Sequence, residues 1–371
     1  MPGRGHRKEI TIVAFRLTKR DMNINTGHKN ILRQKYRILQ TVSRDLPEMR
    51  FYRTFILFSK THFMKRRDFI FKGLGAGVLA GSSLTLGGFS RLMGNPSAPQ
   101  DGDYDLVAVK GTDPPAMFDE GINSLGGMSK FVKPGQSVVI KPNIGWDAVP
   151  ERAANTNPEL IGRIVKRCHE AGAKSVSVFD NTCDEWKKCY ANSGIEEEVT
   201  KAGGSIVPGN SESYYRDVDV PEGKSLTETK VHSLILDSDV FINVPVLKNH
   251  SSAKLTIAMK NLMGVVWDRR WWHQNDLHQC IADYTTFRKP DLNIIDAYRV
   301  MKRNGPRGVS VEDVITLDSL IISADIVAAD AAATKIFGLE PEDIPYIAIA
   351  DEMGIGSMDL SSLNINRIKM G

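Results

Sequence analysis

The sequence is poor in cysteine and lacks the spacing that cysteine clusters need. Its 371 residues include four cysteines, at positions 168, 183, 189 and 280, and no two of them form a C-x-x-C pair. The spacing argues against a zinc ribbon or a ferredoxin cluster in this chain, because both need closely spaced thiolates. A disulfide between Cys183 and Cys189 is one interpretation, and free, partly buried thiols are the favoured one.

Several common catalytic signatures are missing as well. The chain has no G-x-S-x-G elbow, no H-E-x-x-H pair and no Walker loop, which removes the commonest hydrolase, zinc-protease and nucleotide-hydrolase interpretations. A long basic run is also missing from residues 95–371, which carry 29 Lys/Arg and 39 Asp/Glu, a net charge of −10. Nucleic acid is therefore not an expected partner, because it requires a basic face.

Positive charge is instead concentrated at the N-terminus. Residues 1–63 carry 14 Lys/Arg against 4 Asp/Glu, and residues 64–94 carry 5 against 1. Residues 1–63 show no sustained period, and a signal-like segment begins at Met64. We interpret them as a non-native or disordered extension that arises from a misplaced start. A genuine N-terminal arm is the alternative.

The segment "MKRRDFIFKGLGAGVLAGSSLTLGG" within residues 64–94 is typical of a twin-arginine export signal. Arg66 and Arg67 precede a weakly apolar stretch rich in glycine, alanine and serine, and a receptor reads such paired charges. The glycine content and Lys72 disfavour a stable spanning helix. We predict export by the twin-arginine machinery to a periplasmic or extracytoplasmic location. No clean cleavage site is visible before the linker at 95–103, so a form tethered to the membrane by its uncleaved signal is the alternative.

From residue 104 onward, short apolar runs alternate with helical patterns. The expected strands are residues 137–140, 175–180, 240–246, 292–297 and 320–325. A helix is expected to begin at Pro158, capped by Asn157, and others near 194–202 and 326–339. This alternation predicts one α/β domain over residues 104–371. Its sheet is expected to be open, largely parallel and covered by helices on both faces.

Nearly every expected strand ends in charged or amide side chains. Along the chain these are Lys141 and Asn143, Asp180 and Asn181, Asn243 with Lys248 and His250, Asp296, and Asp325 followed by Asp330. Parallel strands bring their carboxyl ends to one edge of a sheet, and ligands bind there. We therefore expect one polar crevice, with helix capping accounting for about two of these endings.

The residue types in this crevice suit a small anion. Lys141, Lys248 and Lys260 can hold a carboxylate or phosphate, and the amides of Asn143, Asn181, Asn243 and Asn261 can orient it. A lysine desolvated beside other cations can lose its proton and act as a base. His250 is another proton-transfer candidate, and a structural hydrogen bond is its equal alternative. Asp180, Asp296, Asp325 and Asp330 offer oxygen ligands for a divalent metal, although capping is the simpler role for any single aspartate.

A second unusual stretch, "VVWDRRWWHQNDLHQCIADY", follows Lys260 and Asn261. It places three tryptophans among Arg269, Arg270, His273 and His278. One interpretation is a lid that holds aromatic and guanidinium groups over the crevice. The other is a connecting helix whose tryptophans pack on the sheet, which would account for at least one of them. Arg269 and Arg270 are the better candidates for ligand binding.

Four separated stretches also resemble, in order, the motifs of Domain of Unknown Function family 362 (DUF362). They are "VVIKPNIGWDAVPERAANTNPELI", "DVFINVPVLKNHSSAKLTIAMKNLMG", "NIIDAYRVMKRNGP" and "SADIVAADAAATKIFGL", within residues 104–350. The resemblance places family positions on Lys141, Asn143, Thr156, Pro158, Asn243, Pro245, Lys248, His250, Lys260, Asn261, Gly264, Asp296, Asp325 and Asp330. It thereby adds Thr156 to the expected ligand-binding residues. Many relatives carry an added cysteine-rich ferredoxin segment, which is missing here, so no iron–sulphur cluster is carried over.

These observations leave more than one function class open. The first is an exported enzyme that acts on a small anionic ligand, with or without a divalent metal. The second is a non-catalytic ligand-binding or partner-docking protein of the cell envelope. A third is a redox-associated protein whose iron–sulphur cluster lies on another subunit. A crevice lysine or histidine with a perturbed pKa would favour the enzyme, whereas ordinary pKa values in a deep groove would favour binding.

Overall fold

The structure is a computed structural model that describes residues 104–371. The expected extension, export signal and linker lie outside these residues. The main sheet consists of β1 (Leu106–Lys110), β2 (Ser137–Pro142), β3 (Ser175–Val178), β4 (Ser205–Ile206), β7 (Val240–Val244), β8 (Val246–His250), β9 (Lys254–Thr256), β10 (Leu292–Met301), β11 (Val314–Ser323) and β12 (Ile365–Lys369). A separate hairpin consists of β5 (Tyr215–Asp219) and β6 (Glu228–His232).

Helices follow most of the strands. They are α4 (Pro114–Ser124), α5 (Pro158–Glu170), α6 (Trp186–Asn192), α7 (Ile195–Lys201), α8 (Ser233–Asp237), α9 (Ala258–Asn261), α10 (Arg269–Gln274), α11 (Leu277–Phe287), α12 (Ile326–Phe337) and α13 (Pro345–Glu352). As expected, Asn157 caps α5 by accepting a hydrogen bond from the backbone N–H of Leu160, and Pro158 occupies the first helical position. Proline suits this position because the first turn of a helix leaves its N–H groups unpaired.

The sheet is mostly parallel, with two strands reversed, β11 and the short β9, which is antiparallel to β8. Its order is β12-β1-β11-β10-β7-β2-β3-β4, and β8 pairs with β10 and β9. Strands β10, β7, β2, β3 and β4 run parallel to their neighbours in that half of the sheet. Strand β11 is antiparallel to both β10 and β1. The α/β fold with its largely parallel sheet is thus confirmed, but β11 does not point in the expected direction.

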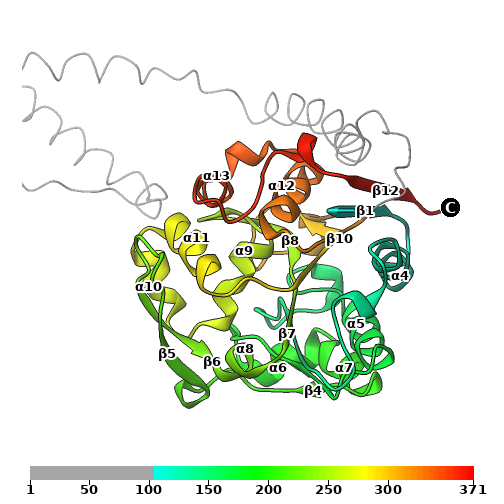
Figure 1. Ribbon diagram of the computed structural model, residues 1–371, viewed down its shortest axis with the longest axis horizontal. Helices are drawn as coiled ribbons and strands as arrows, with labels where there is room; N and C mark the ends of the chain where they lie inside the picture. Colours follow the sequence, from blue (N-terminus) through cyan, green and yellow to red (C-terminus); the bar gives the residue numbers. More distant parts are fainter. Residues whose placement is uncertain (1–103) are drawn as a thin grey trace, which may run out of the picture. The chain divides into compact units, whose positions relative to one another are not determined.

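Alternate residues of the central strands enter two different cores. Val107 and Val109 of β1 pack with α4 and α5 on one face, whereas Leu106 and Ala108 belong to the core on the other face. Figure 1 shows α9, α11, α12 and α13 gathered on one side of the sheet and α4, α5 and α7 on the other. A strand that is buried on both faces has a nearly continuous run of apolar residues in its sequence, as these strands have.

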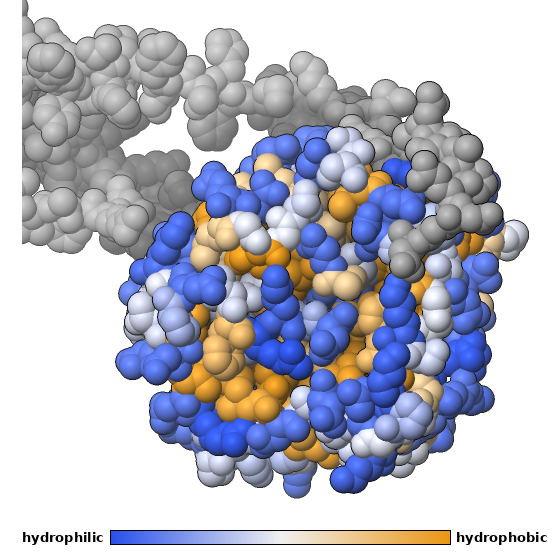
Figure 2. Space-filling view, in the orientation of Figure 1, coloured by the Kyte–Doolittle hydropathy of each residue, from blue (hydrophilic) through white to orange (hydrophobic). Residues whose placement is uncertain are grey.

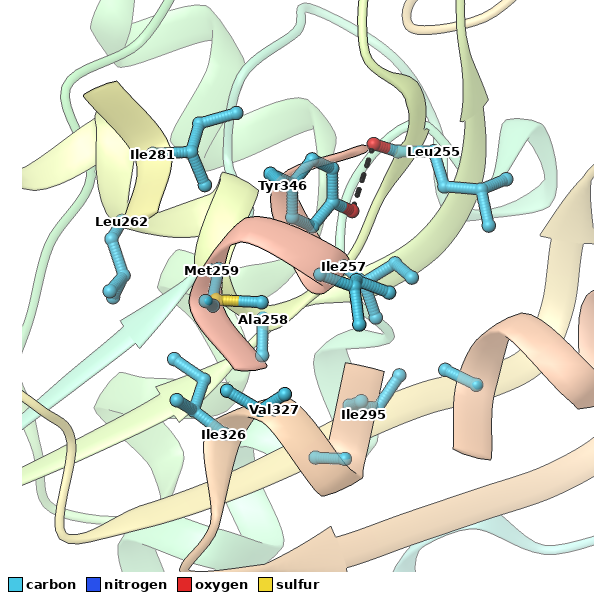
Figure 3. Close-up of a cluster of buried hydrophobic side chains, with 14 of the residues drawn as sticks. Leu255, Ile257, Ala258, Met259, Leu262, Ile281, Ile295, Ile326, Val327 and Tyr346 are labelled. Carbon is cyan, nitrogen blue, oxygen red and sulfur yellow. Dashed lines mark hydrogen bonds between the residues drawn. The ribbon is translucent and has the colours of Figure 1, made fainter. Parts of the chain in front are cut away.

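The core on the α12 side surrounds the short helix α9. Figure 3 shows side chains of α9, α11, α12, α13 and β10 packed together around Ala258 and Met259. Tyr346 of α13 donates a hydrogen bond from its hydroxyl to the carbonyl oxygen of Leu255, 3.3 Å away. Packing from several elements therefore fixes the position of α9, although a helix of this length would not be stable alone.

The surface of residues 104–371 is mixed in character. Figure 2 shows one face, where hydrophilic side chains dominate the rim and hydrophobic side chains are visible between them nearer the centre. Few large hydrophobic side chains are exposed, and Trp271 is among them. Within the described residues, no helix combines the length and apolar character needed to cross a bilayer.

Candidate functional site

A cavity of about 420 Å³ lies where β2, β3 and β8 end. Its walls include three lysines that come from distant parts of the chain, Lys141, Lys248 and Lys260, together with His250 and Asn261. The expectation that these five residues share one pocket is confirmed. They meet because β2 and β7 run parallel, so that residues 141 and 243 lie opposite each other in the sheet. We call this pocket the lysine cavity.

Lys141 is fixed by a buried ion pair. Its Nζ lies 2.9 Å from Oδ1 of Asp180 and donates a hydrogen bond to Oδ1 of Asn261 at 2.8 Å. The second oxygen of Asp180 accepts a hydrogen bond from the backbone N–H of Ile144 at 2.7 Å. Burial lowers the pKa of Lys141, and the negative charge of Asp180 opposes that shift. A buried ammonium group retains its proton most readily beside such a partner, so we assign Lys141 a fixed positive charge.

Gly264 is required by this ion pair. A β-carbon at position 264 would overlap Oδ1 of Asp180 and lie 2.5 Å from Nζ of Lys141. The glycine therefore allows the backbone to approach the buried pair closely. This contact explains why the Lys-Asn-x-x-Gly spacing of residues 260–264 ends in glycine.

A network of amide side chains ties the strands together beneath the cavity. Asn261 donates to Oδ1 of Asn243 at 2.9 Å, and Asn243 donates to Oδ1 of Asn293 at 3.1 Å. The Oδ1 atom of Asn261 also accepts from Nδ2 of Asn143 at 2.9 Å. These amides connect β2, β7, β10 and α9, and Asn243 is fully buried. Asn243 is therefore part of the frame of the site and does not reach a ligand.

Lys248 is held by neutral acceptors. Its Nζ donates to the carbonyl oxygen of Ala154 and, at 3.1 Å, to Oδ1 of Asn143. Only 1% of its surface is exposed. Burial, with a contribution from the positive charges of Lys260 and Lys141, lowers its pKa to about 7. A neutral amine at Lys248 would have its two hydrogens on these acceptors and its lone pair free to accept a proton.

Lys260 differs from the other two lysines because it has no partner. Among residues 104–371, no hydrogen bond or ion pair involves its Nζ, although the residue lines the cavity and is only 7% exposed. Burial, together with the positive charges of Arg269 and Lys141, lowers its pKa to about 8. A buried, unpaired ammonium group is unfavourable unless a ligand supplies the missing negative charge.

His250 has a defined proton arrangement. Its Nδ1 accepts hydrogen bonds from the backbone N–H groups of Ser252 and Ala253 at 3.1 and 3.2 Å, which leaves the proton on Nε2. Burial and the nearby charges of Lys260 and Lys248 lower its pKa to about 2. His250 is therefore neutral and suited to donating a hydrogen bond from Nε2. Its ring stacks on that of His273, with centroids 6.0 Å apart.

The arginine-rich helix α10 borders the cavity. Arg269 and Arg270 both line it, and the guanidinium of Arg269 donates to the carbonyl oxygens of Asn181 and Thr182. Trp272 is buried, as expected for at least one tryptophan, whereas Trp271 is 38% exposed. The stretch thus brings Arg269, Arg270 and His273 to the cavity, whereas none of its three tryptophans lines it. The interpretation as a lid therefore holds for the guanidinium groups and not for the tryptophans.

Besides Asn243, two further residues that were expected to bind the ligand do not line the lysine cavity. Thr156 donates from its hydroxyl to the carbonyl oxygen of Val244 at 2.7 Å and accepts from the N–H of Asn143 at 2.8 Å, so it supports the wall from behind. Asn181 lines a second cleft of about 960 Å³, which also borders on Arg269 and Arg270 and lies between the β5–β6 hairpin and α10. This cleft is larger, but the buried lysines lie in the lysine cavity.

The four aspartates proposed as metal ligands do not come together. Within the described residues, no group of three or more His, Cys, Asp or Glu side chains is arranged to hold a metal ion. Asp180 pairs with Lys141, and Asp296 accepts from the N–H groups of Asn157 and Tyr298 at 2.8 and 3.1 Å. Burial raises the pKa of Asp296 to about 6.

The remaining two aspartates are separated from the cavity by the direction of β11. Because β11 is antiparallel to β10, its carboxyl end lies at the opposite edge of the sheet. Asp325 caps α12 there by accepting from the N–H groups of Val327 and Ala328. Asp330 accepts from the N–H groups of Ala258 and Met259 at 2.6 and 3.1 Å, and burial raises its pKa to about 8. Asp330 therefore positions α9, which carries Lys260 and Asn261.

Sequence reasoning missed Cys183 as a residue of the site. All four cysteines are free, in agreement with the favoured interpretation, and Cys183 lines the lysine cavity. Its position three residues after Asp180, just beyond the end of β3, was the signal that could have revealed it. Sequence reasoning also missed Asn293, which extends the amide network into β10.

Comparison with known proteins identifies the family. Residues 138–335 match the domain of unknown function DUF362, and the chain belongs to this family. A thylakoid-associated protein of Synechocystis sp. is 29% identical over 242 residues, which are 63% of this chain and 73% of that protein.

Two solved structures match part of this chain. The lactate racemase apoprotein of Thermoanaerobacterium thermosaccharolyticum matches with a TM-score of 0.40 and 11% identity, over 62% of this chain and 57% of that one. A Thermotoga maritima protein from a structural genomics programme matches with a TM-score of 0.39 and 12% identity, over 66% of this chain and 60% of that one. The match thus spans less than two thirds of either solved chain.

Proposed function

We propose that this member of the DUF362 family is an enzyme that binds a small carboxylate or phosphate in the lysine cavity and uses Lys260 for proton transfer. The observation that carries the proposal is the unpaired, buried ammonium group of Lys260 in a cavity with two further buried lysines. The carboxylate of Asp180 balances only Lys141. An anion would supply the charge that the other two lysines lack.

In this proposal, some side chains of the cavity bind the ligand and one transfers a proton. Lys141 supplies a fixed charge, and the neutral His250 supplies a hydrogen-bond donor for an oxygen atom of the ligand. With its pKa near 8, Lys260 is present in both protonation states close to neutral pH, which is the condition for efficient general acid–base catalysis. The reaction class is the removal or addition of a proton at an atom next to the anionic group. This proposal requires no metal.

Binding is tested with inorganic phosphate and a panel of small carboxylates in isothermal titration calorimetry. We expect Lys260→Met to weaken binding of the best ligand about tenfold to a hundredfold, the effect of losing one charge-assisted hydrogen bond. Lys188→Met, which removes an exposed lysine of α6, is the control and should leave affinity unchanged. Equal affinity of the wild-type and Lys260→Met proteins would refute the role of Lys260.

Catalysis is tested separately from binding. A carboxylate that binds is incubated with the protein in D₂O, and exchange of its α-proton is followed by ¹H NMR. Exchange that depends on Lys260 supports the enzyme. A ligand that binds without any exchange or conversion would favour the alternative, a non-catalytic ligand-binding protein of the cell envelope.

We also propose that the protein is exported by the twin-arginine route. Arg66 and Arg67 support this proposal, and one relative is described as thylakoid-associated. A chain that begins at Met64 should be exported and folded like the full chain, whereas changing both arginines to lysine should leave the precursor in the cytoplasm. Unchanged export of the double variant would point to the general secretory route.

A further inference from the structure

One thiol lines the wall of the lysine cavity. Cys183 is exposed, whereas the other three cysteines of the chain, at positions 168, 189 and 280, are buried. Cys183 lines the lysine cavity together with Lys141, Lys248 and Lys260, and a negative charge at Cys183 would raise the pKa of all three lysines. The side chain therefore faces the same ligand space as the lysines.

The loop that carries Cys183 is held in place on both sides. Its N–H donates to the carbonyl oxygen of Gly145 at 2.8 Å, and the hydroxyl of Thr182 donates to the carbonyl oxygen of Asp184 at 2.7 Å. The guanidinium of Arg269 binds the two preceding carbonyl oxygens. A reactive group held by rigid contacts beside a bound ligand gains from proximity and orientation.

We propose that Cys183 is a nucleophile of this site, which adds to an electrophilic carbonyl carbon of a small anionic ligand. The inference rests on the proposed function and narrows its substrate class to an anion that carries an aldehyde or ketone group. The unpaired ammonium group of Lys260 independently indicates a ligand in the same space, because it is more than nine-tenths buried and faces the cavity.

Two lysines on the cavity wall can accept and supply the protons that this addition requires. The thiol proton passes to the neutral amine of Lys248, and a bond forms between sulphur and the carbonyl carbon. The π bond of the carbonyl opens, its electron pair moves to oxygen, and that oxygen takes a proton from the ammonium group of Lys260. The product is a hemithioacetal, so no leaving group and no oxidant are needed. A base on the same cavity wall is one way in which a thiol nucleophile is activated, and Lys248 and Cys183 line the same cavity.

The first test is selective alkylation of the full chain. Iodoacetate is an anion and iodoacetamide is neutral, and the modified peptides are identified and followed in time by mass spectrometry. In the native protein we expect modification at Cys183 alone. Relative to the chain unfolded in urea, the ratio of the iodoacetate rate to the iodoacetamide rate should rise about tenfold or more, because a cationic cleft concentrates anions. Lys260→Met should reduce this ratio.

The second test addresses the addition to a carbonyl. Glyoxylate and glycolate have the same charge and similar size, but glycolate lacks the carbonyl group. Glyoxylate should protect Cys183 from iodoacetamide at concentrations where glycolate does not. Equal protection by both would overturn the covalent step, because it would show that occupancy alone shields the thiol. Cys183→Ser should lose the glyoxylate adduct and keep the binding of inorganic phosphate.

The outcomes separate this inference from the proposed function. If phosphate binds but native Cys183 reacts with both reagents no faster than in the unfolded chain, Cys183 is not a nucleophile and the anion site stands. If neither phosphate binding nor a preference for iodoacetate is found, the anion site itself fails, and the inference fails with it.

Discussion

The lysine cavity and the β11–α12 connection both follow strand ends that carry polar residues, yet they use them differently. At the β11 end, Asp325 satisfies backbone N–H groups of Val327, Ala328 and Ser357 at 2.8, 3.0 and 3.0 Å. At the lysine cavity, side chains from different strands contact one another, and Lys260 has no partner among residues 104–371. In these two regions, the direction of the strand decides whether its polar end contributes to the cavity or caps a helix.

The largest expected difference in stability is between variants of Asp180, at the lysine cavity, and of Asp325, at the β11–α12 connection. Asp180→Ala should lower the free energy of unfolding by about 3–5 kcal/mol, because it leaves the buried charge of Lys141 uncompensated. Asp325→Ala removes a helix cap and should lower it by about 1 kcal/mol. Urea unfolding of both variants at pH 7 measures the difference. Equal losses would break the distinction between the two regions.

The next effect concerns two glycines of the lysine cavity. Gly264→Ala should lower the free energy of unfolding by about 1–3 kcal/mol, because its β-carbon would overlap Asp180. Gly145→Ala is the matched control. Its β-carbon would lie 3.6 Å from Oδ1 of Asn143, an ordinary contact, so a change within about 0.5 kcal/mol is expected. Urea unfolding that ranks the two variants the other way would contradict the close approach at Gly264.

The third effect is a dependence of stability on pH, which is small at any single pH step. The pKa of Lys260 is about 8 in the folded protein, below its usual value of 10.5. Between these values the unfolded chain binds more protons, so this lysine makes stability rise with pH, by at most about 1.4 kcal/mol per pH unit. Below pH 8 its penalty is fully present and constant.

This contribution is isolated by comparing variants. Between pH 8 and 10.5, the free energy of unfolding should rise less for Lys260→Met than for the wild-type protein. Below pH 8, Lys260→Met should be the more stable of the two. Lys188→Met should keep the wild-type slope, because Lys188 is exposed on α6. A slope for Lys260→Met equal to that of the wild type would show that Lys260 is not desolvated in the folded protein.

Much of the fold was predictable because its signals are local. The apolar runs of β2 and β7, and the cap formed by Asn157 before Pro158, depend on residues that are neighbours in sequence. The meeting of Lys141, Lys248 and Lys260 was predictable from the rule that parallel strands bring their carboxyl ends to one edge. The prediction that four aspartates form a metal site was wrong. For Asp325 and Asp330 the reason is that the rule fails for β11, whose antiparallel pairing no local pattern reveals.

The sequence by itself determined which residue types stand at the strand ends and which segments form strands and helices. Propensity, capping and apolar periodicity act over a few residues, so they can be read along the chain. Only the tertiary structure decided which of those polar residues have partners. Asp180 pairs with Lys141, Asp330 binds the start of α9, and Lys260 has no partner in the part of the chain that the structure describes. Pairing depends on distances of a few ångströms between residues far apart in sequence, and burial makes each such choice energetically large.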